Sequence, residues 1–394
     1  MKRLFTYTAM LLAVALVSCN KEVQPSEDVN IPVDMGGNYI HFDTGVSTRG
    51  VLLLNNYLNG PFAVYGYNYR STWEAAKAMA KPNVFDNTPQ TVTYNSSDGG
   101  YYTYDPIKTW TGYNYSFYAY YPISDQITPI DKNVEGEPYI TYTLPGGSNP
   151  SVFIDVMTAS YIDTNANSSK SVQLNFEHRL AAIDVGARCY YDYDPNPNNN
   201  DTSDIVQATV EIEQMWLDFE NVVNDKAKIY LNKNIAPEYT ASTSPAREMR
   251  ILTATAERDD NIDIDPNSDG DTQMRIITNP TNKEYGTAEG QQDIYLGPPG
   301  STMILIPQTQ YLKVKPSMQY YLRLPDGKYI QEDKKSVGDS PFAFIYSSEF
   351  EFDRPLLEGR RYYIQFNFTS DAVSVNIVAA DEWDEFDRVD YEFM

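Results

Sequence analysis

The chain has 394 residues, with 54 acidic and 30 basic side chains and a net charge of −24. This excess of acid argues against nucleic-acid binding, which needs clustered Lys and Arg, and against electrostatic attraction to anionic lipid. Tyrosine is abundant, at 33 residues, and there are two cysteines. Aromatic residues favour pleated strands, so the composition points to a β-rich protein.

The N-terminus has the pattern of a secretory signal peptide. Lys2 and Arg3 precede the apolar run 10–17 (MLLAVALV), which is too short to span a bilayer as a helix. Leu16-Val17-Ser18-Cys19 then has the form of a bacterial lipobox. We predict a lipoprotein signal peptide over 1–18 and covalent lipid, palmitate included, on Cys19, which would anchor the chain without spanning the membrane. The alternative is a plain signal peptide followed by an unmodified cysteine.

A tether and a prosegment are expected over 19–49. Residues 20–38 are polar and contain Gly36-Gly37, as flexible tethers do. The segment Tyr39-Ile40-His41-Phe42 is predicted to be a short strand. The segment that follows it, Ser47-Thr48-Arg49-Gly50, is expected to be exposed.

Short strands dominate the remainder of the chain. Apolar alternation or β-rich composition predicts them at 62–67, 115–121, 139–144, 172–180, 206–212, 303–306, 320–324, 342–346, 362–368 and 373–378. Many short strands between Gly, Pro and Asn turns predict an all-β class with two β-sandwich domains, 50–168 and 169–394. The polar stretch 163–170 is the expected linker, and 192–204 and 232–300 are expected to be long loops.

Two local features interrupt this pattern. Ser71 and Glu74 form a capping-box pattern before the helix formers 74–80, and Pro82 follows, which predicts one short helix. The apolar phase shifts by one residue after Leu180, which predicts a β-bulge near Ala181-Ala182.

Signals of catalysis are nearly absent. The two histidines are His41 in the prosegment and His178 on the apolar face of a predicted strand, where a hydrogen-bonded core histidine is favoured over a general base. Cys189 lies in an apolar strand and is expected to be an inert thiol. No phosphate-binding glycine motif occurs. We expect no enzymatic activity.

One stretch resembles a calcium loop. Asp265, Asn267 and Asp269 alternate and are followed by Gly270, as in the first half of such a loop, but Ile276 stands where a bidentate Glu is needed. The alternative is an acidic surface loop. Calcium is the only cofactor that the residues suggest.

A second cluster is aromatic. Tyr101, Tyr102, Tyr104, Trp110 and Tyr113 could stack sugars in a loop or could cover the core of a sandwich.

A series of short segments stands in order along the chain: the lipobox, Thr48-Arg49-Gly50, PFAVYGY (61–67), YSFYAYYP (115–122), DVMTA (155–159), VQLNFEHRLAA (172–182), LIPQ (305–308), LEGRRY (357–362) and Trp383. In this order they resemble the Bacteroidales fimbrillins, the subunits of type V pili, in which Thr48-Arg49-Gly50 is similar to a TR[GA] site. Each motif is weak alone, and their order and spacing carry the resemblance.

The resemblance implies transthyretin-like sandwiches and a surface function. It implies an outer-membrane lipoprotein cut by a trypsin-like protease between Arg49 and Gly50. Release of the first strand would open a groove for a strand of another pilus subunit, building a fimbrium that serves adhesion. The terminal segment 384–394, where Val389, Tyr391 and Phe393 alternate with charged residues, is either the donor or a last strand of its own domain. The alternative function is a monomeric surface lipoprotein that binds glycan.

Overall fold

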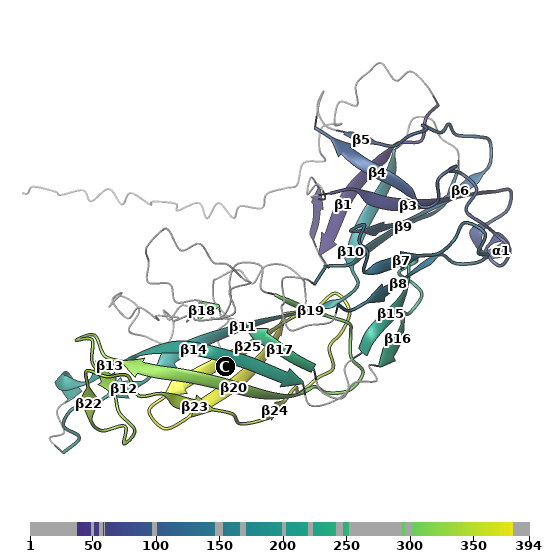
Figure 1. Ribbon diagram of the computed structural model, residues 1–394. Coiled ribbons are helices and arrows are strands. Elements are labelled where there is room, and N and C mark those ends of the chain that lie inside the picture. Colours follow the sequence, from purple (N-terminus) through teal and green to yellow (C-terminus); the bar gives the residue numbers. More distant parts are fainter. Residues whose placement is uncertain are drawn as a thin grey trace, which may run out of the picture.

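Two groups of β-sheets make up the part of the chain that the computed structural model describes (Figure 1). The described residues are 38–48, 51–54, 58, 60–96, 101–145, 153–165, 171–198, 202–219, 224–241, 247–251, 294–295 and 302–380. Their regular structure is almost entirely strand, with a single turn of α-helix and a short 3-10 helix, η3 (Thr202–Asp204). The predicted all-β class is therefore confirmed, while the transthyretin-like topology stays a prediction.

The first sheet has eight strands in the order β2-β1-β10-β9-β6-β3-β4-β5. Its strands are β1 (Phe42–Thr48), β2 (Val51–Leu54), β3 (Phe62–Tyr69), β4 (Gln90–Asn95), β5 (Tyr101–Thr103), β6 (Asn114–Tyr121), β9 (Met157–Asn165) and β10 (Val172–His178). Neighbours are antiparallel except β1 and β10, which are parallel.

The central strands of this sheet are buried on both faces. Val64 and Phe117 contribute to one core, which also contains Phe42 of β1. Tyr65 and Tyr118 contribute to the core on the opposite face. This is why β3 and β6 are apolar almost throughout and do not alternate.

A four-stranded sheet in the order β16-β15-β8-β7 completes the second of these cores. Its strands are β7 (Ile127–Pro129), β8 (Tyr139–Thr143), β15 (Asn224–Tyr230) and β16 (Glu238–Ala241). Ile140 and Ile229 belong to the same buried cluster as Tyr65. Strands from distant parts of the sequence therefore share one layer (Figure 1).

The second group has two larger sheets and a small hairpin. One sheet consists of β11 (Ala181–Tyr190), β18 (Ile294–Tyr295), β19 (Met303–Leu305), β25 (Arg361–Thr369) and β26 (Val373–Ala380). The other consists of β14 (Thr209–Phe219), β17 (Arg247–Ile251), β20 (Lys313–Arg323), β21 (Tyr329–Ile330), β22 (Val337–Gly338), β23 (Phe344–Tyr346) and β24 (Phe350–Glu351). The hairpin pairs β12 (Asp192–Tyr193) with β13 (Val206–Gln207).

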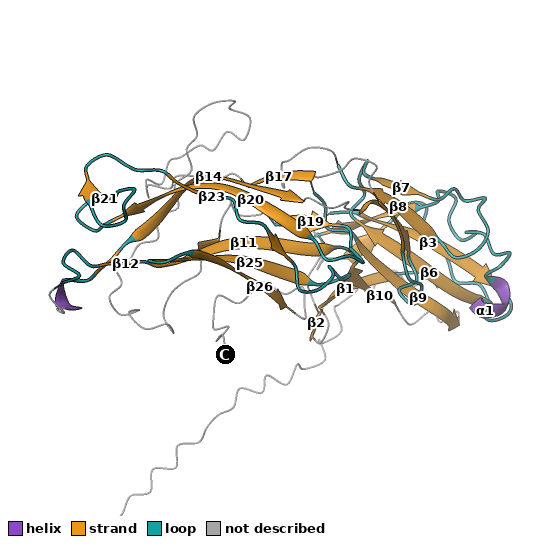
Figure 2. Cartoon of the chain, turned by 90° about the horizontal axis from the view of Figure 1, so that it is seen from below, coloured by secondary structure: helices purple, strands orange, loops and turns teal. Residues whose placement is uncertain are grey.

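These two larger sheets lie in layers, with β11, β25 and β26 in one and β14, β17, β20 and β23 in the other (Figure 2). Strand β20 alternates exposed and buried residues along its length, so Val314, Met318 and Leu322 all face the core. This half-buried pattern is the one that antiparallel strands with one solvated face show.

The boundary between the two groups differs from the expected one. Strand β10 lies beyond the expected linker 163–170, yet it pairs with β9 and β1 in the first sheet. The chain passes to the second group between His178 and Ala181, where β10 ends and β11 begins. The predicted bulge near Ala181-Ala182 is therefore wrong, because the phase shift there reflects a change of sheet.

The helix prediction needs a similar correction. Helix α1 covers only Trp73–Ala76, and its N-cap is Thr72, whose Oγ1 accepts from the Ala75 N–H at 3.4 Å, not Ser71. Buried Trp73 anchors this turn and donates from Nε1 to Glu137 Oε1 at 2.9 Å. The expected loops also hold more structure than predicted, since β12 and η3 lie within 192–204 and β16, β17 and β18 within 232–300.

Candidate functional site

Strand β1 is a core strand although it lies at the N-terminal end of the described chain. Ile40, just before it, is 1% exposed and Phe42 is 2% exposed. The Phe42 ring lies among four aromatic rings, which we name the Phe42 box. Their centroids lie 6.3 Å (Phe62), 6.3 Å (Phe85), 5.7 Å (Tyr104) and 5.5 Å (Phe117) from that of Phe42. Aromatic rings packed in this way bury a large apolar area, and pairs of such rings favour edge-to-face contacts.

The backbone around β1 is hydrogen-bonded along two edges. On one edge it runs parallel to β10, from Phe42 opposite Val172 to Val46 opposite Phe176, and the Val172 N–H donates to the His41 carbonyl at 2.7 Å. On the other edge the Ile40 N–H donates to the Lys108 carbonyl at 2.9 Å, and the Trp110 N–H donates to the Asn38 carbonyl at 2.8 Å. The backbone at residues 38–41, where the chain enters β1, is therefore hydrogen-bonded on both edges.

We name residues 104–110, which form this second edge, the clamp. The Tyr104 hydroxyl donates to the Ile40 carbonyl at 2.9 Å and accepts from the Lys108 N–H at 3.3 Å. Burial raises the pKa of Tyr104 to about 12, so its hydroxyl keeps its proton at neutral pH. Near β5, Thr44 Oγ1 donates to the Tyr102 hydroxyl at 2.7 Å.

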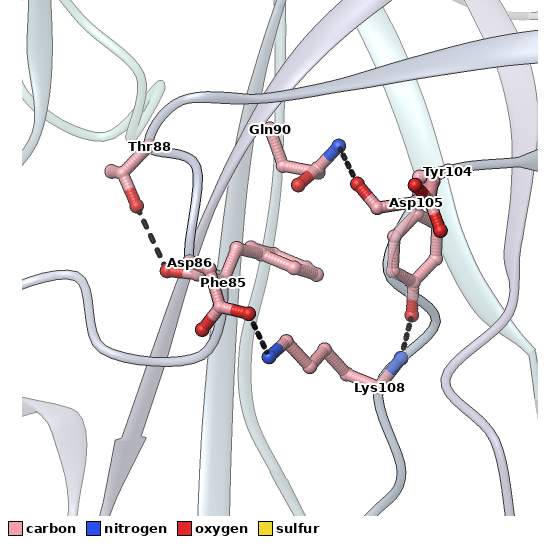
Figure 3. Close-up of polar contacts among 7 residues, drawn as sticks. All are labelled: Phe85, Asp86, Thr88, Gln90, Tyr104, Asp105 and Lys108. Atoms are coloured by element: carbon pink, nitrogen blue, oxygen red, sulfur yellow. Dashed lines mark hydrogen bonds and ion pairs between the residues drawn. The ribbon is translucent and has the colours of Figure 1, made fainter.

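The clamp is bonded to the end of the connection between β3 and β4 and to Gln90, the first residue of β4 (Figure 3). Lys108 Nζ pairs with Asp86 Oδ2 at 2.7 Å, and Gln90 Nε2 donates to the Asp105 carbonyl at 3.3 Å. Within that loop, Thr88 Oγ1 donates to the Phe85 carbonyl at 3.2 Å. None of these bonds involves β1.

Strands β1 and β2 form an antiparallel hairpin, with Thr48 opposite Val51 and Gly45 opposite Leu54. Arg49 and Gly50, the expected cleavage site, are the two residues between these strands in the sequence. They lie outside the described residues. In the sheet order, β2 is an edge strand whose neighbour is β1.

The other predicted site residues also lie outside the described part of the chain. They are Cys19, the calcium-loop candidates Asp265, Asn267 and Asp269, and the donor candidates Val389, Tyr391 and Phe393. Among the residues that are described, no group of three or more His, Cys, Asp or Glu side chains could hold a metal ion. Within the same ranges, no helix is long and apolar enough to cross a membrane.

The two side chains considered for catalysis, His178 and Cys189, are both bonded to neighbouring residues of the fold. His178 Nδ1 pairs with Asp155 Oδ2 at 2.7 Å, and its side chain is 9% exposed. Cys189 is buried, its Sγ donates to the Ala208 carbonyl at 3.3 Å, and burial raises the pKa of its thiol to about 12. A thiol with such a pKa is a poor nucleophile at neutral pH.

The aromatic cluster considered for sugar stacking belongs mainly to the core. Tyr102, Tyr104 and Trp110 are 7%, 6% and 5% exposed. Tyr113 is exposed but lies against Arg70, whose guanidinium is 5.1 Å from its ring centroid. The sequence patterns alone do not predict the clamp. The one available signal was the spacing of Tyr102 and Tyr104, which places both on one face of an extended segment.

The fimbrillin-like family model matches residues 58–381. The crystal structure of a fimbrial protein from Bacteroides vulgatus is similar, with a TM-score of 0.61 and 18% identity over 88% of this chain and 99% of that chain. The fimbrial anchor protein Mfa2 from Porphyromonas gingivalis matches at 10% identity over 88% of this chain and 96% of that chain, with a TM-score of 0.33, too low to support an argument.

A search of curated proteins found no match. The likeness to the Bacteroides vulgatus protein supports a shared fold. The family model covers most of the chain, including both groups of sheets but neither β1 nor β2. The chain belongs to the fimbrillin-like family.

Proposed function

We propose that this chain is a structural subunit of a fimbria on the bacterial surface, and that it joins other subunits by exchanging β1 for a strand of a neighbour. Family membership supports the fimbrial assignment. The observation that carries the exchange is the position of β1, which lies at the N-terminal end of the described chain but contributes a buried aromatic residue to the first core.

Loss of β1 would leave an acceptor groove. The edge of β10 would lose its parallel partner over the five residues from Val172 to Phe176. The Phe42 box would lose its central ring and expose Phe62 and Phe117 to water. An open edge beside an apolar slot favours addition of a strand, because the incoming backbone satisfies the edge and its alternate side chains fill the slot.

Processing between Arg49 and Gly50 would separate β1 from the rest of the chain. The two residues stand between β1 and β2 in sequence, so a trypsin-like protease acting there would release the strand without cutting the sheet elsewhere. The released segment 19–49 would carry the lipid on Cys19 with it. The terminal segment with Val389, Tyr391 and Phe393 is the candidate donor, and head-to-tail joints of this kind build fibres.

The test is N-terminal sequencing and native mass measurement of the protein taken from the cell surface, for the wild-type chain and for Arg49→Ala. We expect the wild-type chain to begin at Gly50 and to give a ladder of multimers. Arg49→Ala should remain an unprocessed monomer, whereas a control change at the exposed Arg354 should leave the ladder intact. A wild-type chain that stays monomeric with lipidated Cys19 at its N-terminus would overturn the proposal and favour a glycan-binding lipoprotein.

A further inference from the structure

The clamp has contacts that do not depend on the strand it holds. Its ion pair from Lys108 and the hydrogen bond accepted by the Asp105 carbonyl both go to residues 86–90 (Figure 3). The Tyr104 ring also packs on Phe85, with centroids 5.4 Å apart at 85°. The clamp and one wall of the Phe42 box therefore form a single unit with the β3–β4 loop.

The clamp and the Phe42 box make two kinds of contact with residues 38–42. The Lys108 carbonyl, the Trp110 N–H and the Tyr104 hydroxyl bond to backbone atoms, so they accept any extended segment. The Phe42 box contacts a side chain through four aromatic rings. Backbone contacts supply affinity in such sites, and side-chain pockets supply the choice of sequence.

A glycine in β3 shapes one side of this unit. A Cβ on Gly66 would lie 2.7 Å from Phe85 Cε2 and 2.7 Å from Val84 Cβ. The Gly66 carbonyl accepts from the N–H groups of Asn83 at 3.0 Å and Val84 at 3.1 Å. Residues 83–85 are therefore packed directly on the sheet, through contacts with Gly66 that do not involve β1.

We propose that the clamp and the Phe42 box select the strand that replaces β1, and that they take a strand of another chain with the pattern apolar residue, spacer, aromatic residue, in the register of Ile40-His41-Phe42. This inference rests on the strand exchange proposed above and adds the chemistry of the partner. The terminal sequence of this chain carries the pattern twice, as Val389-Asp390-Tyr391 and Tyr391-Glu392-Phe393.

The experiment uses the whole protein cut once after Arg49, with labelled peptides of residues 38–48 as probes and fluorescence anisotropy as the readout. The wild-type peptide should exchange into the protein. A Phe42→Leu peptide should bind roughly tenfold more weakly, because it fills the box without an aromatic ring, and a Phe42→Ala peptide roughly 100-fold more weakly. An Asp43→Ala peptide is the matched control, because Asp43 is exposed.

A second arm changes the protein. Tyr104→Phe keeps the ring and removes the hydroxyl that donates to Ile40, so it should weaken binding of the wild-type peptide about fivefold. Tyr101→Phe is the control, since the Tyr101 hydroxyl accepts from Asn95 Nδ2 at 3.2 Å and has no bond to β1 in the described part of the chain.

The outcomes separate the two proposals. Exchange of the wild-type, Phe42→Leu and Phe42→Ala peptides with equal affinity would overturn the selection and leave strand exchange standing. Failure of every peptide to enter would overturn both. The peptide series leaves the folded protein unchanged, so it decides the question even if Tyr104→Phe folds poorly.

Discussion

The Arg179 Nε lies 2.5 Å from Glu358 Oε1, and this ion pair joins the crossover between β10 and β11 to the turn that precedes β25. Arg179 is 1% exposed and also donates from Nη1 to Thr158 Oγ1 in β9 at 3.2 Å. A single buried cation thus connects the first sheet to the second group of strands.

Glu358→Gln should destabilise the protein more than Arg179→Met does. The first change leaves a buried guanidinium opposite a neutral amide, whereas the second removes the charge altogether. We expect Glu358→Gln to cost about 2–3 kcal/mol, less than the loss typical of a fully buried pair, because the Glu358 side chain is 30% exposed. Urea unfolding measures both, with the exposed pair Arg354–Asp353 as control through Asp353→Asn. The reverse order of stabilities would contradict the prediction.

Phe42→Ala should cost about 3–5 kcal/mol of unfolding free energy in the uncut chain, because it leaves a cavity among four aromatic rings. Asp43→Ala, at the exposed neighbouring position, should stay within about 0.5 kcal/mol of wild type. Chemical denaturation of both variants tests this. A small loss for Phe42→Ala would mean that β1 contributes little to the first core.

Gly66→Ala should destabilise the protein by about 1–3 kcal/mol, because the added methyl group meets Phe85 and Val84 in a packed core. Gly112→Ala is the matched control, since a Cβ there meets nothing within 4 Å. Thermal unfolding of the pair is the measurement. Equal melting temperatures for the two variants would show that the β3–β4 loop can move away from the sheet.

Docking of β1 should weaken in acid through His41. Burial lowers the pKa of His41 from its ordinary value of 6.5, and the Asp43 carboxylate opposes this shift. The released strand, with the ordinary pKa, therefore binds the proton more tightly than the docked strand. The His41 contribution is complete above that ordinary pKa and declines as the pH falls through about 6.5 toward the lower pKa of the docked form.

Release of a labelled 38–48 segment from the protein cut after Arg49 measures this dependence, because that segment contains His41 and β1. We expect more release at about pH 5.5 than at about pH 7.5, and a flatter profile for His41→Gln. Release that increases as the pH rises through the same window would contradict the assignment to His41.

Cys189 should resist thiol reagents in the folded protein. Burial raises the pKa of this thiol to about 12, and its side chain is inaccessible. In a Cys19→Ser chain, we expect reaction with a disulfide reagent only after denaturant is added. Rapid labelling of the native protein would show that β11 opens locally.

The strand ranges predicted from the sequence all contain strands, because apolar alternation is a local property, but other strands, such as β4, β9 and β15, lie outside those ranges. The strand at Val172–His178 and the class of fold follow from this alone. The sheet to which a strand belongs does not, because pairing joins residues that are far apart in sequence. Strand β15 pairs with β8, and β11 runs parallel to β25, and neither relationship has a local signal.

In the candidate site, too, some features follow from local sequence patterns and others depend on tertiary packing. The sequence predicts a prosegment strand at 39–42, but β1 covers Phe42–Thr48, so the short pattern locates the strand without giving its extent. The Arg49-Gly50 cleavage site stays a prediction. The sequence leaves open whether Tyr102, Tyr104 and Trp110 serve a binding loop or a core, and only their burial assigns them to the core that contains Phe42. Composition identifies such side chains as amphipathic, and tertiary packing decides which end is buried.

Placement of β15 and β16 beside β8 has a consequence for the nascent chain. All eight strands of the first sheet have been synthesised once residue 178 is added, but half of the layer that covers one of its faces is encoded at 224–241. The N-terminal core therefore cannot close in the order in which it is synthesised, and closure waits for a long-range pairing that is intrinsically slow. Any fragment that stops short of residue 241 would expose the Ile140 and Tyr142 layer, so truncation at the apparent boundary near residue 180 should yield an aggregating product and not a free-standing domain.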